Sequence, residues 1–336
     1  MTAASLATLW AFIIAFAVFV YVVMDGFDLG LGILFPAFPA KADRDVIMNS
    51  VAPVWDGNET WLVLGGGGLM AAFPLAYAVL MPALYTPVIA MLVGLIFRGV
   101  AFEFRWRTTQ ATRNRWDLAF AGGSWLAALA QGIALGAVLQ GIHVEGRHYA
   151  GGWWDWLTPF SVLTGAALVI GYALLGATWL VMKTEGDLRE KAYALSWSLL
   201  FAMLGAIVAV SIATPFLHIQ YAQRWFTWPN IIVTAPVPLA VAAVTFLLLR
   251  SLANKRDNQP FFQTLALFAL SYAGLGISMY PYIVPQSITI WQAAAPENSQ
   301  LFMLVGVAVL IPLILAYTGW AYWVFRGKVR PGHGYH

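Results

Sequence analysis

The sequence predicts an all-α, polytopic membrane protein with about nine transmembrane helices. Of its 336 residues, 61% are hydrophobic and only 10% are charged, whereas about a quarter of the residues of soluble domains are charged. The mean hydropathy of +0.74 agrees with this class. Apolar runs of about 20 residues recur along the chain, each long enough to cross roughly 30 Å of hydrocarbon as a helix. A transmembrane barrel would instead show short segments of alternating hydrophobicity.

Polar breaks between the apolar runs delimit the predicted helices. The expected spans are 6–35, 47–72, 77–102, 117–141, 158–182, 194–217, 231–250, 262–284 and 301–325. The loops between them are too short for a soluble domain, so we expect residues 1–336 to form a single integral membrane domain. No basic residue precedes the first run, and the run is longer than the apolar core of a signal peptide. We therefore expect it to be the first membrane helix.

Lysine and arginine residues concentrate in alternate loops, and cytoplasmic loops near membrane ends carry the excess of positive charge. The basic set comprises Lys41, Arg44, Arg105, Arg107, Arg113, Arg115, Lys183, Arg189, Lys191, Arg250, Lys255, Arg256, Arg326, Lys328 and Arg330. The opposite loops hold only Arg147 and Arg224. We therefore predict a periplasmic N-terminus and a cytoplasmic C-terminus. The pI of about 9.1 reflects this topology, so the expected surroundings are a lipid bilayer and no nucleic-acid partner is expected.

Ionisable residues interrupt the first three apolar runs near their predicted cytoplasmic ends. They are Asp25, Asp28, Asp56, Glu59, Arg98 and Glu103. An unpaired charge at membrane depth costs about 2.5–3.5 kcal/mol or more, so these groups should face one another or water. One arginine cannot neutralise five acids in a low dielectric, and some carboxyls should stay protonated. Such a cluster is suited to proton uptake, although polar residues in membrane bundles also simply hold helices together.

Asp25, Asp56 and Arg98 are the strongest candidates within this cluster. Asp28, Glu59 and Glu103 could each lie close enough to the interface to be solvated. A run of four glycines, 65–68, follows in the second helix. We interpret it as a site of close helix packing rather than a ligand contact.

The sequence offers few ligands for a metal or a haem. It contains no cysteine, which excludes thiolate sites. Its five histidines fall in outer loops, at an outer helix end or in the tail: His143, His148, His218, His333 and His336. A haem needs axial ligands at membrane depth, so we expect no metal and no cofactor to be bound by ligands of this chain.

Three motifs carry a resemblance to a known family. They are Met24-Asp25-Gly26-Phe27-Asp28-Leu29-Gly30, Trp55-Asp56-Gly57-Asn58-Glu59-Thr60-Trp61 and Phe97-Arg98-Gly99-Val100-Ala101-Phe102-Glu103-Phe104-Arg105. In these motifs, and in its length and helix order, the chain resembles subunit II of cytochrome bd-type quinol oxidases. The sequence around Asn58 and Phe102 is most similar to that of the cyanide-insensitive oxidase branch.

The resemblance implies a terminal oxidase of the bacterial inner membrane that passes electrons from quinol to oxygen and makes water. In that family the larger subunit I carries haems b and d and the quinol-oxidising loop, and subunit II binds none of the haems. The acids that match Asp25, Asp28 and Asp56, with the arginine that matches Arg98, lie along a proposed proton route. Some members also bind a structural quinone in subunit II, for which no residues are assigned here, or carry a small accessory subunit.

Two other functions remain open at this point. The first is a proton-coupled secondary transporter that works alone, although such proteins usually place their carboxylates near the midplane between related halves. The second is a purely structural partner subunit whose acids only fix helix packing. The resemblance favours a haem-free subunit that scaffolds subunit I and supplies protons from the cytoplasm, with Asp56 as the first carrier candidate and Arg98 as the countercharge.

Overall fold

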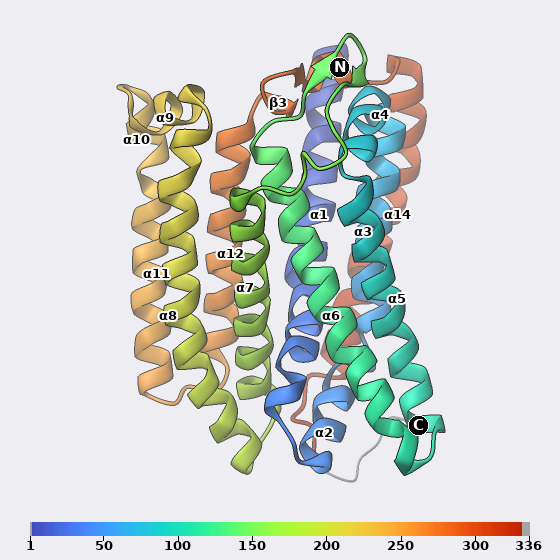
Figure 1. Ribbon diagram of the computed structural model, residues 1–336, viewed down its shortest axis with the longest axis vertical. Coiled ribbons are helices and arrows are strands. Elements are labelled where there is room, and N and C mark those ends of the chain that lie inside the picture. Colours follow the sequence, from blue (N-terminus) through green and yellow to red (C-terminus); the bar gives the residue numbers. More distant parts are fainter. Residues whose placement is uncertain (1, 331–336) are drawn as a thin grey trace.

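The computed structural model describes residues 2–330 and shows a bundle of long helices that run side by side (Figure 1). His333 and His336 lie outside the described residues. The long helices are α1 (Ala3–Leu34), α3 (Trp55–Ala72), α5 (Tyr85–Arg107), α6 (Gln110–Leu139), α7 (Pro159–Lys183), α8 (Gly186–Leu217), α11 (Pro236–Ala253), α12 (Gln259–Met279) and α14 (Glu297–Val324). The chain begins at one end of the bundle, and this end is called the first end below.

Short elements close the two ends of the bundle (Figure 1). At the end opposite the first lie η1 (Phe35–Ala37) and α2 (Lys41–Val51); near the first end lie α4 (Pro74–Ala83), α9 (Ile219–Phe226), α10 (Asn230–Thr234) and α13 (Ile290–Ala293). Two antiparallel hairpins complete the first end. They are β1 (Val144–Glu145) with β2 (His148–Tyr149), and β3 (Tyr282–Val284) with β4 (Ile288–Thr289).

The all-α membrane fold is confirmed. Within residues 2–330, eight helices are long and apolar enough to cross a membrane. The remaining pass is made by α3 and α4, which follow one another along α1. The polar first turn of α3 and its four glycines lower its hydropathy below that of the other passes.

Two predicted helix boundaries in this region were wrong. The expected helix 47–72 is divided, because α2 ends at Val51 and α3 begins only at Trp55. The expected helix 77–102 begins instead at Tyr85. Phe73 leaves helical geometry with φ −132° and ψ 62°, and Pro74 then starts α4, which is a favoured position for proline.

The two predicted sets of basic residues lie at opposite ends of the bundle. Arg147 in the β1–β2 turn and Arg224 in α9 lie at the first end, whereas Arg44 in α2 and Arg105 in the last turn of α5 lie at the other. The assignment of the α2 end to the cytoplasm stays a prediction.

Glycines allow the central helices to pack backbone to backbone. Helix α1 packs against α3, α6 and α7. A Cβ on Gly30 of α1 would collide with the carbonyl oxygen of Tyr172 in α7, and a Cβ on Gly176 would lie 2.6 Å from the Gly30 carbonyl carbon. One helical turn before Gly30, Phe27 stacks on Trp179 with ring centroids 4.3 Å apart. Close approach at the glycines thus sets the aromatic packing of the core.

The segment after α14 binds at the ends of α7 and α8 that lie on the same side of the bundle as α2. The Lys183 ammonium donates to the carbonyl oxygens of Phe325, at 2.5 Å, and Gly327, at 3.2 Å. The Val329 amide donates to the Lys183 carbonyl over 2.8 Å. Lys328 donates to Asp257, in the loop between α11 and α12, over 2.6 Å. We call residues 325–330 the tail strap.

Asp257 is the acidic anchor of the tail strap. Partial burial acts to raise the pKa of its carboxyl. Hydrogen bonds from Lys328 and Tyr193, together with the positive charge of Lys328 and Arg189, outweigh burial and hold the pKa of Asp257 below its usual range. A depressed pKa means that the contact stabilises the fold above the unfolded-state pKa and is lost as the pH falls through the folded-state value.

Replacing Gly30 by alanine should disrupt the contact between α1 and α7. Overpacking of a close interface costs about 1–3 kcal/mol or more, so we expect a lower unfolding temperature of the purified protein or a loss of folded protein. Gly205→Ala in α8 is the matched control, because a Cβ there meets nothing within 4 Å. Equal unfolding temperatures for both variants would contradict this packing account.

Acidification should release the tail strap. We expect the protection of the amides of residues 325–330, measured relative to their intrinsic exchange rates, to be lost as the pH falls below the usual aspartate pKa of about 3.9, because the folded-state pKa of Asp257 lies below that value. Asp257→Asn should give fast exchange already at neutral pH. Asp187→Asn, which alters an exposed acid in the first turn of α8, should leave the protection of the strap unchanged. Protection of the strap that stays constant on acidification of the unaltered chain would refute the role of Asp257.

Candidate functional site

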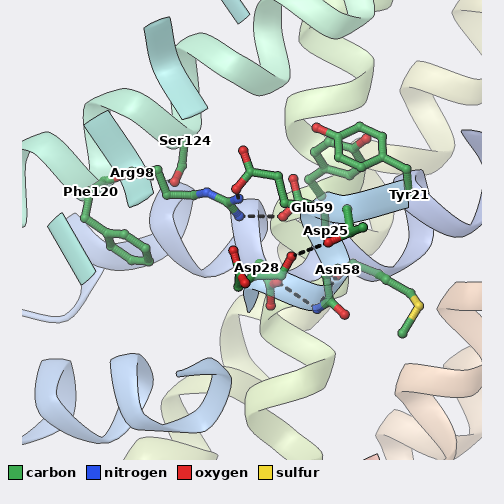
Figure 2. A network of polar contacts seen from close by, with 12 residues as sticks. Tyr21, Asp25, Asp28, Asn58, Glu59, Arg98, Phe120 and Ser124 are labelled. Atoms are coloured by element: carbon green, nitrogen blue, oxygen red, sulfur yellow. Dashed lines mark hydrogen bonds and ion pairs between the residues drawn. The ribbon is translucent and has the colours of Figure 1, made fainter. Parts of the chain in front are cut away.

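A buried arginine joins carboxyl groups from two other helices. Arg98 of α5 is fully buried. Its Nη1 donates to Asp25 Oδ1 of α1 over 2.5 Å, and its Nη2 donates to Glu59 Oε2 of α3 over 2.9 Å. The Asp25 side chain is also fully buried, whereas that of Glu59 is 27% exposed. Figure 2 shows the three side chains converging between their helices.

A second buried carboxyl lies one turn along α1. Asp28 is 0% exposed, and its Oδ2 accepts a hydrogen bond from Asn58 Nδ2 over 2.8 Å (Figure 2). The other end of the Asn58 amide, Oδ1, accepts a hydrogen bond from the Tyr322 hydroxyl of α14 over 2.9 Å. Helix α14 therefore reaches the carboxyl cluster through one amide. We call Asp25, Asp28, Glu59 and Arg98 the acid cluster.

Helix packing explains why the charged groups meet. Asp25 and Asp28 are three residues apart and share a face of α1. Gly94 of α5 and Gly123 of α6 let these two helices approach, since a Cβ on Gly123 would lie 2.9 Å from the Arg98 amide nitrogen. The Trp55 ring covers the guanidinium, with Arg98 Cζ 5.9 Å from its centroid. The arginine is thus held against α1 by its neighbours on three helices.

The acid cluster contains more acid than base. Three carboxyls surround one guanidinium, and a buried charge without a partner is strongly unfavourable. Within the described residues, Asp25 Oδ2, Asp28 Oδ1 and Arg98 Nε are buried and have no hydrogen-bond partner. Buried polar atoms normally have a partner in protein or water, so each unpaired carboxyl oxygen is a position where a proton or a water molecule can bind.

Neutral polar groups continue from Asp25 towards the middle of the bundle. The phenol of Tyr21, one turn earlier in α1, lies beside Asp25 (Figure 2). Gln131 of α6 donates to the Tyr21 hydroxyl over 2.7 Å and accepts from the Tyr172 hydroxyl of α7 over 2.9 Å. These groups connect the acid cluster to α6 and α7.

Two predicted members are not part of the acid cluster. Asp56 is exposed, and Glu103 is 63% exposed with its closest ion pair to Arg107 at 3.9 Å. The reason is the rotation of each helix. In α3 the buried stripe passes through Asn58, Trp61 and Gly65, which puts Glu59 at its edge and Asp56 on the opposite face. The expected convergence of all five acids was therefore wrong, and Asp28 and Glu59 are more deeply placed than Asp56.

A second buried ion network, which was not predicted from the sequence, lies around Arg105. Arg105 is 0% exposed and donates to Asp117 Oδ1 of α6 over 2.6 Å and to Asp45 Oδ1 of α2 over 2.7 Å. Arg44 donates to the other Asp117 oxygen over 2.9 Å. Arg105 was assigned to a basic loop by its position in the chain. The sequence feature that indicated this network was Asp117, an aspartate in the first part of the apolar helix α6.

The histidines that the structure describes lie at the first end of the bundle (Figure 1). No group of three or more histidine, aspartate or glutamate side chains in residues 2–330 is placed to hold a metal. His143 and His148 are exposed at the first end. His218 Nε2 lies 2.7 Å from the Gln140 carbonyl oxygen, also at that end.

Comparison with known proteins assigns the chain to a family. Residues 6–325 match the family model of cytochrome bd terminal oxidase subunit II. The chain is 31% identical to the cytochrome bd-I ubiquinol oxidase subunit 2 of Escherichia coli K12, over 96% of this chain and 94% of that protein. It is 26% identical to the cytochrome bd ubiquinol oxidase subunit 2 of Bacillus subtilis 168, over 97% of both chains.

The fold has a close counterpart among solved structures. A chain of the bd oxidase from Geobacillus thermodenitrificans superposes with a TM-score of 0.74 at 20% identity, covering 96% of this chain and 100% of that one. At this identity the likeness concerns the fold. The family model and the relatives carry the assignment: the chain belongs to the cytochrome bd terminal oxidase subunit II family and is a subunit of a bd-type quinol oxidase.

Proposed function

We propose that this chain is the haem-free subunit II of a bd-type quinol:oxygen oxidoreductase in a bacterial inner membrane, built as one membrane domain. In this proposal it scaffolds the haem-bearing subunit I and contributes a cytoplasmic proton-uptake route for the reduction of oxygen to water. The observation that carries the proposal is the acid cluster, in which Arg98 pairs with Asp25 and Glu59 and a third carboxyl, Asp28, is buried against Asn58.

The partner supplies the redox chemistry in this proposal. Subunit I holds haems b and d and oxidises quinol, in keeping with the relatives whose names describe ubiquinol oxidases. The chain described here takes no electron step. A structural quinone and a small accessory subunit belong to the proposal without assigned residues. The assignment to the cyanide-insensitive branch also remains part of the proposal.

A face of α3 supports docking of subunit I. Asp56, Thr60, Val63 and Gly67 are exposed along one stripe of this helix. A Cβ on Gly67 would meet nothing within 4 Å, so another helix can approach closely there. Asp56 lies two residues from Asn58 and so sits at the depth of the acid cluster. A carboxylate exposed to hydrocarbon at this depth is costly, which favours protein over lipid as the cover.

The members of the acid cluster differ in access, and this suggests their order in proton transfer. Asp25 and Asp28 are fully buried, Glu59 is partly exposed and Asp56 is exposed. Protons would therefore be held at the free carboxyl oxygens of Asp25 and Asp28 and pass through Glu59 to the α3 face, where Asp56 meets subunit I. Arg98 keeps part of the cluster ionised. Glu103 faces away and is left out of this route.

Asp25→Asn should slow quinol-driven oxygen consumption at least tenfold, which corresponds to about 1.4 kcal/mol in the barrier. The physical reason is that an amide cannot take up and release the proton. The measurement is oxygen uptake by the purified complex as a function of pH, with haem content as the check of assembly. Asp56→Asn should also slow turnover, and Glu297→Gln, an exposed acid at the first end, is the control.

Unchanged turnover and pH dependence in an assembled Asp25→Asn complex would reject the proton route. Failure of assembly alone, with normal turnover in the remaining complex, would favour a purely structural subunit.

The complex itself separates an oxidase subunit from a lone transporter. Gentle purification of this chain from its native membrane should bring a second large subunit with b-type haem and chlorin bands in the reduced-minus-oxidised visible spectrum. A solitary, haem-free chain from respiring membranes that takes up a substrate after reconstitution would instead establish a proton-coupled transporter.

A further inference from the structure

Tyr322 lies near the C-terminal end of α14, and its hydroxyl group is linked to the acid cluster through one intermediate side chain. The Tyr322 hydroxyl donates to Asn58 Oδ1 over 2.9 Å. Asn58 is 1% exposed, and its Nδ2 donates to Asp28 Oδ2 over 2.8 Å and to the Met24 carbonyl over 3.4 Å. The hydrogen-bonded path from Tyr322 to that carboxyl runs through the Asn58 amide.

The direction of these hydrogen bonds makes the tyrosine an orienting group. An amide can present either its oxygen or its NH₂ group to a neighbour. A phenol that donates to Oδ1 fixes the oxygen towards α14, and the NH₂ group must then face Asp28. The Met24 carbonyl, which accepts from Nδ2 over 3.4 Å, supports the same orientation. Without the phenol hydrogen this orientation is held less firmly, and a turned amide would place its oxygen against the carboxyl, where a hydrogen bond needs a proton on Asp28.

The aromatic and basic groups around Tyr322 hold it in place. Its ring meets the edge of Trp179 at 6.4 Å and 82°. Trp179 Nε1 donates to Ser50 Oγ over 3.2 Å, and Lys183 Nζ lies 5.0 Å from the Trp179 ring centroid. The same Lys183 ammonium binds the Phe325 carbonyl, which follows the last turn of α14. Positive charge at a helix C-terminus is favourable, so Lys183 fixes the end of α14 from which Tyr322 projects.

A small set of charged groups surrounds Asp28. Asp25 of α1, Glu59 of α3 and Arg98 of α5 act on it electrostatically, and Tyr322 of α14 is the further titratable group next to this set. Asn58 is its hydrogen-bond donor. Asn58 is thus the group that stabilises the ionised form of Asp28 by a hydrogen bond, and this bond depends on the orientation of its amide.

We propose that Tyr322 is a positioning residue which orients the Asn58 amide towards Asp28 and thereby sets the proton equilibrium of that carboxyl, with the tail strap holding α14 in place. The inference rests on the proposed function for its effect on turnover, because proton handling at Asp28 matters only if the acid cluster supplies protons. The orientation itself is independent of that function and is measured separately.

The test uses the assembled oxidase complex and infrared difference spectra recorded on a pH change. Asp28→Asn identifies the carboxyl band of Asp28. Tyr322→Phe removes a single hydroxyl and should shift this band and slow oxygen consumption severalfold. Tyr272→Phe is the matched control, because Tyr272 also donates one hydrogen bond to α1, at the Ala15 carbonyl over 2.8 Å. The control should leave the band and the turnover unchanged.

A double variant tests the path through the amide. Asn58→Leu alone should shift the Asp28 band, and adding Tyr322→Phe should cause no further shift, since both changes act on one interaction. Additive shifts would overturn the proposed path, as would an unchanged band in assembled Tyr322→Phe. If the Tyr322→Phe complex does not assemble, the Asp28 band is compared instead in Asn58→Leu and in Lys183→Met, which releases the tail strap. An Asp28 band that is unchanged in both variants would reject the proposal.

Failure of the orienting role of Tyr322 can be distinguished from failure of the proposed proton supply. A shifted band with unchanged oxygen consumption supports Tyr322 as the orienting group and rejects the role of Asp28 in proton supply. An unchanged band with slowed consumption rejects the orienting role, whatever the function of the acid cluster.

Discussion

The pairing of Arg98 with Asp25 is the interaction on which the half of the bundle nearer to α2 depends. A guanidinium at this depth is stable only with carboxylates beside it. Asp25 comes from α1 and Glu59 from α3, so three helices must meet at one level. Glycines at the contacts of α5 with α6 and of α1 with α7 let the backbones approach enough for this. The electrostatic requirement and the small residues therefore act together, and neither alone would bring the groups into contact.

The two buried ion networks differ in their balance of charge. Around Arg98, two carboxyls pair with one arginine, and the third carboxyl of the cluster, Asp28, is bound by Asn58 instead. Around Arg105, two aspartates are met by Arg105, Arg44 and, at 3.7 Å, Arg113. The second network needs no added proton to be neutral or positive. It is therefore suited to fastening α2, α5 and α6 together, whereas the excess of acid in the first network leaves room for exchangeable protons.

Much of the fold follows from the sequence because a membrane imposes long apolar helices and buried partners for charge. The long apolar helices, of which eight within residues 2–330 are long and apolar enough to cross a membrane, and the meeting of Asp25 with Arg98 could be predicted in this way. The rotation of α3 could not. Both of its faces carry small or apolar residues, so hydropathy gave no sign that Asn58 faces inward and Asp56 outward. The contact of Tyr322 with Asn58 could not be predicted for a similar reason, because it depends on the lateral packing of α14, which loop lengths do not determine.

The tail strap also has a consequence for the biogenesis of the protein. Residues 325–330 are synthesised after all of the described helices, yet they bind Lys183, Thr184 and Asp257, which are made earlier. A nascent chain that stops after α14 would contain every described helix and all four residues of the acid cluster but not the contacts that fix the end of α14. The end of α14 is thus secured only after its own synthesis, and a chain that terminates before residue 325 is distinguishable from a longer one by the looseness of a single helix end.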